Sequence, residues 1–195
     1  MRVLVLLLAL VASCASAAAP MQTATFAPTP ATPTPAAAPS VAPRIAGPRW
    51  PAVPPGATRA RVTRVVDGDT VVLDGISVGY RESRGRPGRH ARLIGIDTPE
   101  VFGRAGCFGR QASAFTKQQL TGRDVLVGFD VGHLDRYGRA LVYIWKTDGT
   151  FFNGELAESG YALQETVPPN VRYADEFLQY VRDARAAARG LWSAC

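Results

Sequence analysis

The prolines and the acidic residues of this chain occupy different parts of the sequence. Eleven of the fifteen prolines precede Gly56, all sixteen acidic residues follow Val66, and no charged residue occurs from Val3 to Pro43. Such a proline-rich segment cannot bury enough apolar surface to fold, so we expect the folded domain over residues 57–195. That part has 19 basic and 16 acidic residues, and this small excess does not by itself indicate a nucleic-acid partner.

Residues 1–17 have the pattern of a secretory signal. A positively charged residue is followed by a nine-residue apolar run from Val3 to Val11, which is shorter than the roughly 20 residues that span a bilayer. The sequence from Val11 to Cys14 is typical of a bacterial lipobox and predicts a lipid on Cys14. The alternative is ordinary cleavage near residues 15–17, with Cys14 removed. Either way the protein is expected to be exported, and only such a lipid would attach it to a membrane.

Residues 18–56 are rich in Ala, Pro and Thr and are expected to form a disordered linker of polyproline II character. At about 3.1 Å per residue, such a linker could reach on the order of 120 Å. It would act as a stalk if Cys14 is lipidated and as a non-specific linker otherwise.

Cys107 and Cys195 are the two cysteines of the folded part. An even pair in an exported domain favours a disulfide bond, with two free thiols as the alternative. A zinc site is not expected, because these cysteines and the histidines His90 and His133 do not show a ligand spacing.

Alternating and periodic apolar patterns predict a small α+β domain, with five strands in a barrel and about three helices. A turn at Asp67-Gly68 is expected to join the first two strands. The predicted strands are 61–66, 70–73, 90–96, 125–129 and 141–145. The predicted helices are 112–120, 152–159 and 174–189, the last with Phe177, Val181, Ala184 and Ala188 on its buried face.

Three carboxylates and two arginines are placed at predicted strand ends and turns. Carboxylates such as Asp69, Asp97 and Glu100 suit a hard cation such as Ca²⁺ or Mg²⁺. Arginines such as Arg92 and Arg139 match the oxygens of a phosphate. Together they would suit phosphodiester hydrolysis. Each of these short segments alone is also typical of an ordinary turn or a solvated surface charge.

The spacing of Arg92 and Asp97 adds a structural condition. An odd separation places two residues on opposite faces of an ideal strand. A bend or bulge near Asp97 is therefore needed to bring the two side chains together.

Several segments, in this order, resemble motifs of the staphylococcal nuclease (thermonuclease) family, and the likeness runs from about Arg61 to Ser193. The matching segments are Val65–Val71, Arg92–Glu100, Ala112–Lys117, Asp135–Arg139 and Leu191–Ser193. The resemblance implies a five-stranded OB-type barrel with three helices and one Ca²⁺-dependent nuclease site.

By matching position, the resemblance assigns a role to each site residue. The carboxylates of Asp69 and Asp97 and the main-chain carbonyl of Thr98 would bind Ca²⁺. Glu100 would position or deprotonate the attacking water. Arg92 and Arg139 would hold the scissile phosphate and stabilise charge in the transition state, and Arg136 and Tyr137 would contact a terminal phosphate.

The resemblance also implies the substrate and the product. The substrate would be DNA and RNA, preferentially single-stranded, with P–O5′ cleavage that leaves 3′-phosphates, and the protein is expected to act as a monomer. The alternative is an OB-fold module that binds nucleic acid, or another surface partner, without catalysis.

Three features depart from the family pattern. The two nucleotide-flanking tyrosines have no aromatic counterpart in residues 164–169, where stacking worth about 1–3 kcal/mol per base would be lost; Tyr173 is expected to pack beside its helix. The segment between Thr70 and Arg92 is longer, and its arginines form either an electrostatic arm or a solvated loop; they are Arg81, Arg84, Arg86 and Arg89. The loop from Glu100 to Cys107 is shorter.

Three further residues are expected to have no catalytic role. His133 is predicted to be exposed rather than a proton donor near Arg139. Trp145 and Trp192 are predicted to be packing residues.

Overall fold

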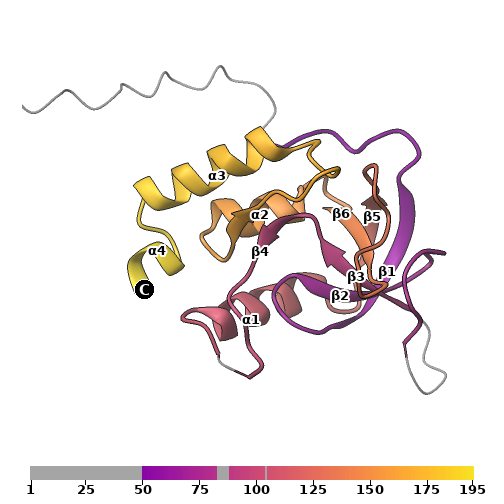
Figure 1. Cartoon of the computed structure of the whole chain (residues 1–195), viewed down its shortest axis with the longest axis horizontal. Coiled ribbons are helices and arrows are strands. Elements are labelled where there is room, and N and C mark those ends of the chain that lie inside the picture. The colour runs from indigo at the N-terminus through magenta and orange to yellow at the C-terminus, as the bar shows by residue number, and fades with distance from the viewer. Residues whose placement is uncertain (1–49, 83–87, 104) are drawn as a thin grey trace, which may run out of the picture. The chain divides into compact units, whose positions relative to one another are not determined.

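Four strands precede the first helix in the computed structural model (Figure 1), which describes residues 50–82, 88–103 and 105–195. The strands are β1 Thr58–Val65, β2 Thr70–Asp74, β3 Arg89–Leu93, β4 Gly95–Asp97, β5 Asp124–Gly128, β6 Ala140–Lys146 and β7 Leu163–Glu165. The helices are α1 Gly109–Leu120, α2 Phe152–Glu158, α3 Ala174–Ala186 and α4 Leu191–Ala194.

Five strands close into a barrel in the order β1-β2-β3-β6-β5, which confirms the predicted barrel and the α+β class. β3 pairs in parallel with β6, and the other barrel pairs are antiparallel. Ala60 and Val62 of β1 alternate with exposed residues and point into the core. A register shift between Val62 and Arg64 moves the alternation by one residue, so Val65 is also buried.

The predicted turn at Asp67-Gly68 joins β1 to β2. Oδ1 of Asp67 accepts hydrogen bonds from the backbone N–H groups of Asp69 (3.2 Å) and Thr70 (2.8 Å). A short acidic side chain can close a turn in this way because it reaches the backbone two or three residues further on. The turn therefore directs Asp69 away from the hairpin, toward the end of β4.

The strand predicted over residues 90–96 is broken in two. β3 ends at Leu93, and the chain turns at Gly95, where φ is +85°. β4 then leaves the barrel and pairs with β7 in a separate two-stranded sheet, with Gly95 opposite Glu165. The bend expected near Asp97 is confirmed, and it places Arg92 and Asp97 beside each other.

The helices differ from their predicted extents mainly at the ends. α1 begins at Gly109, three residues earlier than predicted, and α3 ends at Ala186, three residues earlier than predicted. The predicted buried face of α3 was partly wrong. Tyr180 is buried beside Phe177 and Ala184, whereas Val181 is half-buried and Ala188 is exposed beyond the helix with a positive φ.

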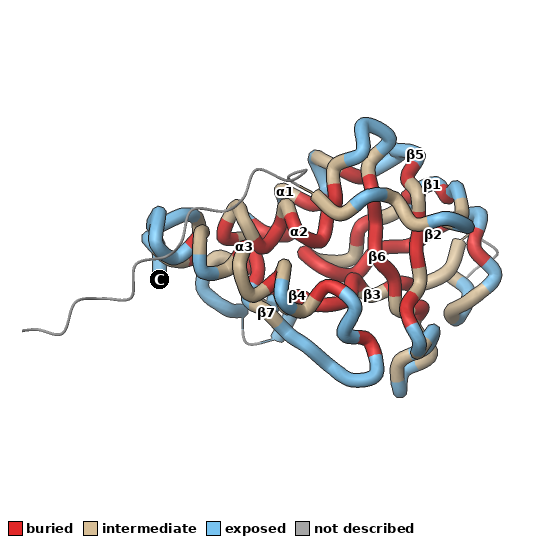
Figure 2. Tube along the Cα trace, turned by 90° about the horizontal axis from the view of Figure 1, so that it is seen from above, coloured by how far each residue is buried: buried red, intermediate tan, exposed pale blue. Residues whose placement is uncertain are grey.

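The core is continuous from the barrel to the helices, with buried residues concentrated around β6 (Figure 2). Trp145 is fully buried, as predicted, and Tyr173 packs edge-on against Tyr143 at 4.8 Å between ring centroids. Trp192 is half-buried under the guanidinium of Arg185, 5.4 Å from the ring centroid. Tyr173 is therefore a buried packing residue, as expected, and its ring contacts Tyr143 and Trp145 of β6 as well as Phe151.

Residues just before the predicted domain boundary also belong to the folded part. The indole N–H of Trp145 donates a hydrogen bond to the carbonyl of Pro51 (2.9 Å), and the ring of Trp50 packs edge-on against Tyr180 at 5.3 Å. The start of the domain, predicted at residue 57, is thus corrected to include residues 50–56. These residues cover part of the core, where the sequence suggested a proline-rich linker.

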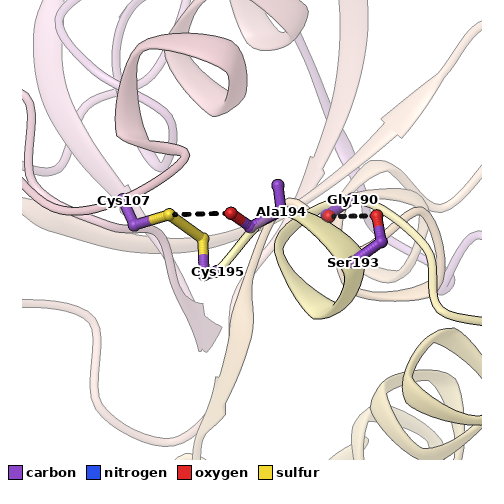
Figure 3. The surroundings of a disulfide bond; sticks show 5 residues. All are labelled: Cys107, Gly190, Ser193, Ala194 and Cys195. Carbon is purple, nitrogen blue, oxygen red and sulfur yellow. Dashed lines mark hydrogen bonds between the residues drawn. A yellow bond between two sulfur atoms is a disulfide. The ribbon is translucent and has the colours of Figure 1, made fainter.

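Cys107 and Cys195 form a disulfide bond with 6.0 Å between their Cα atoms (Figure 3). The bond joins the segment just before α1 to the segment just after α4. Ser193 Oγ donates a hydrogen bond to the carbonyl of Gly190 (3.1 Å) within the same short helix.

The predicted signal, Cys14 and most of the predicted linker lie outside the described residues. Within the part of the chain that the structure describes, no helix has the length and apolar character needed to cross a membrane.

Candidate active site

The turn between β1 and β2 is packed against the end of β4. Asp69 is buried, and its Oδ2 accepts hydrogen bonds from the backbone N–H of Thr98 (2.7 Å) and from the Thr98 hydroxyl (2.8 Å). A Cβ atom at Gly68 would lie 2.5 Å from Oγ1 of Thr98, so the turn approaches this closely only with glycine. Thr116 of α1 donates to the Gly68 carbonyl (2.7 Å) and fixes the turn from the other side.

Arg92 occupies the centre of the site, with a side chain only 13% exposed. One terminal nitrogen forms an ion pair with Oδ1 of Asp69, and the other donates to Oδ1 of Asp97 (2.8 Å) and Oε2 of Glu165 (3.0 Å). The second nitrogen also lies 3.1 Å from the Ile96 carbonyl. The structure thus brings together Arg92, Asp69 and Asp97, which were predicted as site residues from the sequence. It adds Glu165, which was not predicted.

Arg139 is oriented by an acidic residue of its own turn. Its Nε donates to Oδ2 of Asp135 (2.6 Å), and Oδ1 of Asp135 accepts from the backbone N–H groups of Tyr137 and Arg139 (2.9 Å each). Nη1 of Arg139 donates to the Thr70 hydroxyl (3.3 Å), which in turn donates to Oδ1 of Asp69 (3.2 Å). A chain of hydrogen bonds therefore connects the second arginine to the buried carboxylate.

Arg136 and Tyr137 are exposed beside this network. Nη2 of Arg136 donates to the Tyr137 hydroxyl (2.6 Å). The guanidinium carbons of Arg136 and Arg139 lie 4.8 Å and 5.5 Å from the centroid of the Tyr137 ring. Two cations thus lie close to the ring of Tyr137.

Glu100 lies apart from the other carboxylates. It is exposed, and among the described residues no hydrogen bond or ion pair holds its carboxylate. The backbone of Glu100 is held in position. Its carbonyl accepts a hydrogen bond from the N–H of Gly106 (2.8 Å), and the next residue, Cys107, forms the disulfide bond. The short loop therefore fixes the backbone of Glu100 and leaves its side chain open to solvent.

The donor set fits a hard divalent cation. The guanidinium of Arg92 contacts both Asp69 and Asp97, each through a different terminal nitrogen, so the two carboxylates lie near each other, and Thr98 follows Asp97 directly in the chain. Among the described residues there is no group of three or more His, Cys, Asp or Glu residues that could hold a metal ion. An ion here would be bound by two carboxylates, one carbonyl and water, a hard oxygen set that suits Ca²⁺.

A cleft of about 480 Å³ opens beside these residues. Its lining includes the charged residues Arg92, Asp135 and Arg139 and the apolar residues Leu134, Val167, Pro168 and Pro169. Part of the lining comes from the segment 164–169, in which the sequence lacks aromatic residues. A larger polar depression of about 600 Å³, lined by Arg61, Lys146 and Asp148 among others, contains none of the predicted site residues.

Burial shifts the pKa of two groups near the site. Burial raises the pKa of Asp67 above its ordinary 3.8, while hydrogen bonds from Thr70 and the charges of Arg92 and Arg139 oppose the rise. Burial also lowers the pKa of His90 below 6.5. The charges of Arg64 and Arg139 act in the same direction, and Glu82 acts against it.

The long segment after β2 is partly described. Arg81 is exposed, and Arg89 is half-buried with Nη1 donating to the Gly79 carbonyl (2.7 Å). Arg84 and Arg86 lie outside the described residues. His133 is exposed, as expected, with its ring 5.2 Å from that of Phe129.

Sequence reasoning missed two residues of the site. Glu165 reaches Arg92 because β7 pairs with β4, and residue spacing gave no signal of this contact between residues 73 positions apart. Asp135 was part of a recognised segment, but its contacts with Arg139 were not anticipated. An acidic residue four positions before an arginine in a tight turn could have suggested them.

Comparison with known proteins identifies the family. The model of the family "Staphylococcal nuclease homologue" matches residues 90–194. The chain is 34% identical over 136 residues to the thermonuclease of Staphylococcus hyicus, a match that covers 68% of this chain and 75% of that protein. The chain therefore belongs to the staphylococcal nuclease family, and the resemblance seen in the sequence is confirmed.

Two further relatives extend the comparison. The thermonuclease of Staphylococcus intermedius is 36% identical over 134 residues, covering 67% of this chain and 74% of that protein. Endonuclease YncB of Bacillus subtilis is 30% identical over 135 residues, covering 67% of this chain and 59% of that protein.

Proposed function

We propose that this protein is a Ca²⁺-dependent nuclease that hydrolyses phosphodiester bonds of DNA and RNA. The observation that carries the proposal is the convergence of Asp69, Arg92, Asp97 and Arg139 beside one cleft, in a member of a family whose relatives include thermonucleases and an endonuclease.

The two arginines would bind the scissile phosphate. Arg92 is held at the centre of the site, and Arg139 is directed toward it by Asp135 and Thr70. A guanidinium presents planar donors that match phosphate oxygens, and its charge is worth more in a partly buried site than in water. Both groups would therefore stabilise the negative charge that grows in the transition state.

The metal ligands would be the carboxylates of Asp69 and Asp97 and the carbonyl of Thr98. A bound Ca²⁺ ion would polarise the phosphate and offset its charge. The hydrogen bonds from Thr98 to Asp69 restrict that carboxylate to one orientation, which leaves Oδ1 toward the site.

Glu100 would position or deprotonate the attacking water. Its side chain is solvent-exposed and its carbonyl is held by the N–H of Gly106, so the carboxylate is free to accept a hydrogen bond from water. Cleavage is proposed at the P–O5′ bond, leaving 3′-phosphates, with Arg136 and Tyr137 contacting a terminal phosphate. Single-stranded substrate is proposed from the resemblance to the staphylococcal nuclease family.

The test measures acid-soluble nucleotides released from denatured DNA by the purified protein, with Ca²⁺ and then with EGTA. We expect cleavage with Ca²⁺ and none with EGTA. Glu100→Gln should abolish most cleavage and retain substrate binding. Asp124→Asn is the matched control, because it also removes one exposed carboxylate but lies on β5 outside the site.

Two outcomes would contradict the proposal. If folded protein binds DNA equally well without Ca²⁺ and leaves it intact, the chain is a binding module. If Ca²⁺ raises the melting temperature but DNA has no effect, the carboxylates form a structural metal site.

The location of the protein is also proposed. The sequence of residues 1–17 supports export, and Cys14 supports attachment to the membrane through a lipid. The protein is proposed to act as a monomer. Metabolic labelling with a fatty acid, lost in Cys14→Ala, tests the attachment.

A further inference from the structure

The segment that follows β2 is joined to the site by backbone hydrogen bonds. The N–H of Tyr80 donates to the carbonyl of Gly138 (2.8 Å), and the N–H of His90 donates to the carbonyl of Tyr80 (3.0 Å). Tyr80 therefore lies between the start of β3 and the turn that carries Tyr137 and Arg139. Its backbone position is determined by both.

The side chain of Tyr80 stacks on one ring and is partly exposed among the residues that the structure describes. Its ring stacks on His90, with 4.2 Å between centroids and 18° between planes. The residue is 45% exposed, whereas the side chain of His90 is only 13% exposed. A large aromatic ring is thus presented to solvent on a platform that is itself packed.

The support beneath the ring is held by polar contacts. Nε2 of His90 lies 3.4 Å from Oε2 of Glu82, and the same oxygen accepts from Nη2 of Arg64 at 2.5 Å. The N–H of Glu82 also donates to the carbonyl of Gly88 (2.9 Å). These contacts hold His90 in place, so the ring stacked on it loses little freedom when a ligand binds.

The ring also borders the phosphate-binding side of the site. A Cβ atom at Gly138 would lie 3.9 Å from Cδ1 of Tyr80, and Gly138 separates Tyr137 from Arg139. The neighbouring Arg81 and Arg136 are both exposed and positively charged. The surface around Tyr80 therefore offers an open aromatic face next to cations, which is the combination that binds single-stranded nucleic acid.

We infer that Tyr80 is a stacking platform for a base of single-stranded nucleic acid, one that continues beyond the nucleotide at Arg92 and Arg139. The inference rests on the proposed function and deepens it, because it names an additional substrate-binding residue. It also provides an aromatic contact in a chain that has no aromatic residue at positions 164–169. Stacking on one ring tolerates any base, so Tyr80 would add affinity without sequence preference.

The test is equilibrium binding of a fluorescein-labelled single-stranded oligothymidylate to the full protein, in EGTA and at low salt, so that no cleavage occurs. We expect Tyr80→Ala to weaken binding by about five- to 100-fold, the value of one base stack. Tyr80→Phe keeps the ring and should bind within about twofold of the wild type. Tyr80→Leu keeps apolar bulk without the ring and should be weakened like Tyr80→Ala.

The controls separate stacking from folding. Thermal melting of each variant shows whether it is folded. If Tyr80→Ala does not fold, the comparison of Tyr80→Phe with Tyr80→Leu tests the stacking role. Two results would overturn the inference. In the first, the wild type, Tyr80→Leu and Tyr80→Phe bind the oligonucleotide equally well, so the ring has no role. In the second, Tyr80→Phe and Tyr80→Leu are weakened equally, so the aromatic ring is not what binds.

Failure of the inference can be told from failure of the proposed function. If the wild type binds and cleaves DNA but the Tyr80 variants bind equally well, only the inference is wrong. If the folded wild type neither binds nor cleaves, the proposed function is wrong and the inference falls with it.

Discussion

Gly95 lies directly against the ring of Phe177, and a Cβ atom at Gly95 would overlap that ring. The glycine also has a φ of +85°, which other residues rarely adopt. The contact joins the break between β3 and β4 to α3. It thereby connects the position of Asp97 relative to Arg92 with the packing of the core.

Gly95→Ala should therefore be strongly destabilising. The expected loss is about 2–5 kcal/mol, from strained backbone and from displacement of a fully buried ring. Gly122→Ala is the matched control, because Gly122 also has a positive φ (+71°) but has no atom within 4 Å of an added Cβ. That variant should lose only about 1–2 kcal/mol. Denaturant unfolding measures both, and equal losses would show that the contact with Phe177 has no role.

Removing the disulfide should lower stability without altering the fold. The bond closes a loop of 88 residues, for which the chain-entropy model gives about 4–5 kcal/mol as an upper value. We expect Cys107→Ser with Cys195→Ser to lose about 2–5 kcal/mol in denaturant unfolding. Wild type unfolded under a reducing agent should match the double variant, and a loss below about 0.5 kcal/mol would contradict the expectation.

The lowered pKa of His90 predicts a loss of stability in acid. The unfolded chain takes up a proton near pH 6.5, whereas the folded protein does so only at lower pH, so unfolding binds protons between these two values. Stability attributable to this group is complete above about pH 6.5 and is lost as the pH falls toward the folded pKa.

Melting temperatures between pH 7.5 and pH 5 test this prediction. His90→Gln should flatten the decline in melting temperature, whereas His133→Gln, which removes the other histidine of the sequence, should keep it. If the wild type and both variants show the same decline in melting temperature, titratable groups other than His90 cause it.

Glu165→Gln should increase affinity for nucleic acid. Glu165 is one of three carboxylates on Arg92 and is itself about half exposed, so the variant removes a negative charge from a cleft proposed to bind phosphate. We expect KM for denatured DNA to fall about two- to tenfold at low salt, with a smaller change at high salt because of screening.

Asp124→Asn is the matched control for this prediction. Asp124 is 49% exposed and paired with Arg61, much as Glu165 is 48% exposed and paired with Arg92. The control should leave KM nearly unchanged, since Asp124 lies outside the cleft. Equal effects of the two substitutions would indicate a dependence on net charge alone.

Local sequence patterns were sufficient to predict the barrel strands and the turn at Asp67-Gly68. These features depend on neighbouring residues, such as the side chain of Asp67 and the backbone of Thr70. The condition that the chain must bend before Asp97 also followed from spacing alone.

The remaining features depend on contacts between distant segments. The parallel pairing of β3 with β6 and the pairing of β4 with β7 have no local signature. Glu165 reaches the site only through the second of these pairings, and Tyr80 only through its hydrogen bond to Gly138. Residues 50–56 were assigned to the linker because their prolines are typical of a linker, and the sequence gives no signal that Trp50 packs on Tyr180.

The place of β6 between β3 and β5 has a consequence for the order of assembly. During synthesis from the N-terminus, β1, β2, β3 and β5 emerge first and can form an open sheet with β3 and β5 at its two edges. Unpaired edges of this kind favour aggregation with other chains. Only when residues 140–146 emerge can one strand cover both edges at once, so a truncated chain that stops earlier is expected to aggregate more readily than the whole domain.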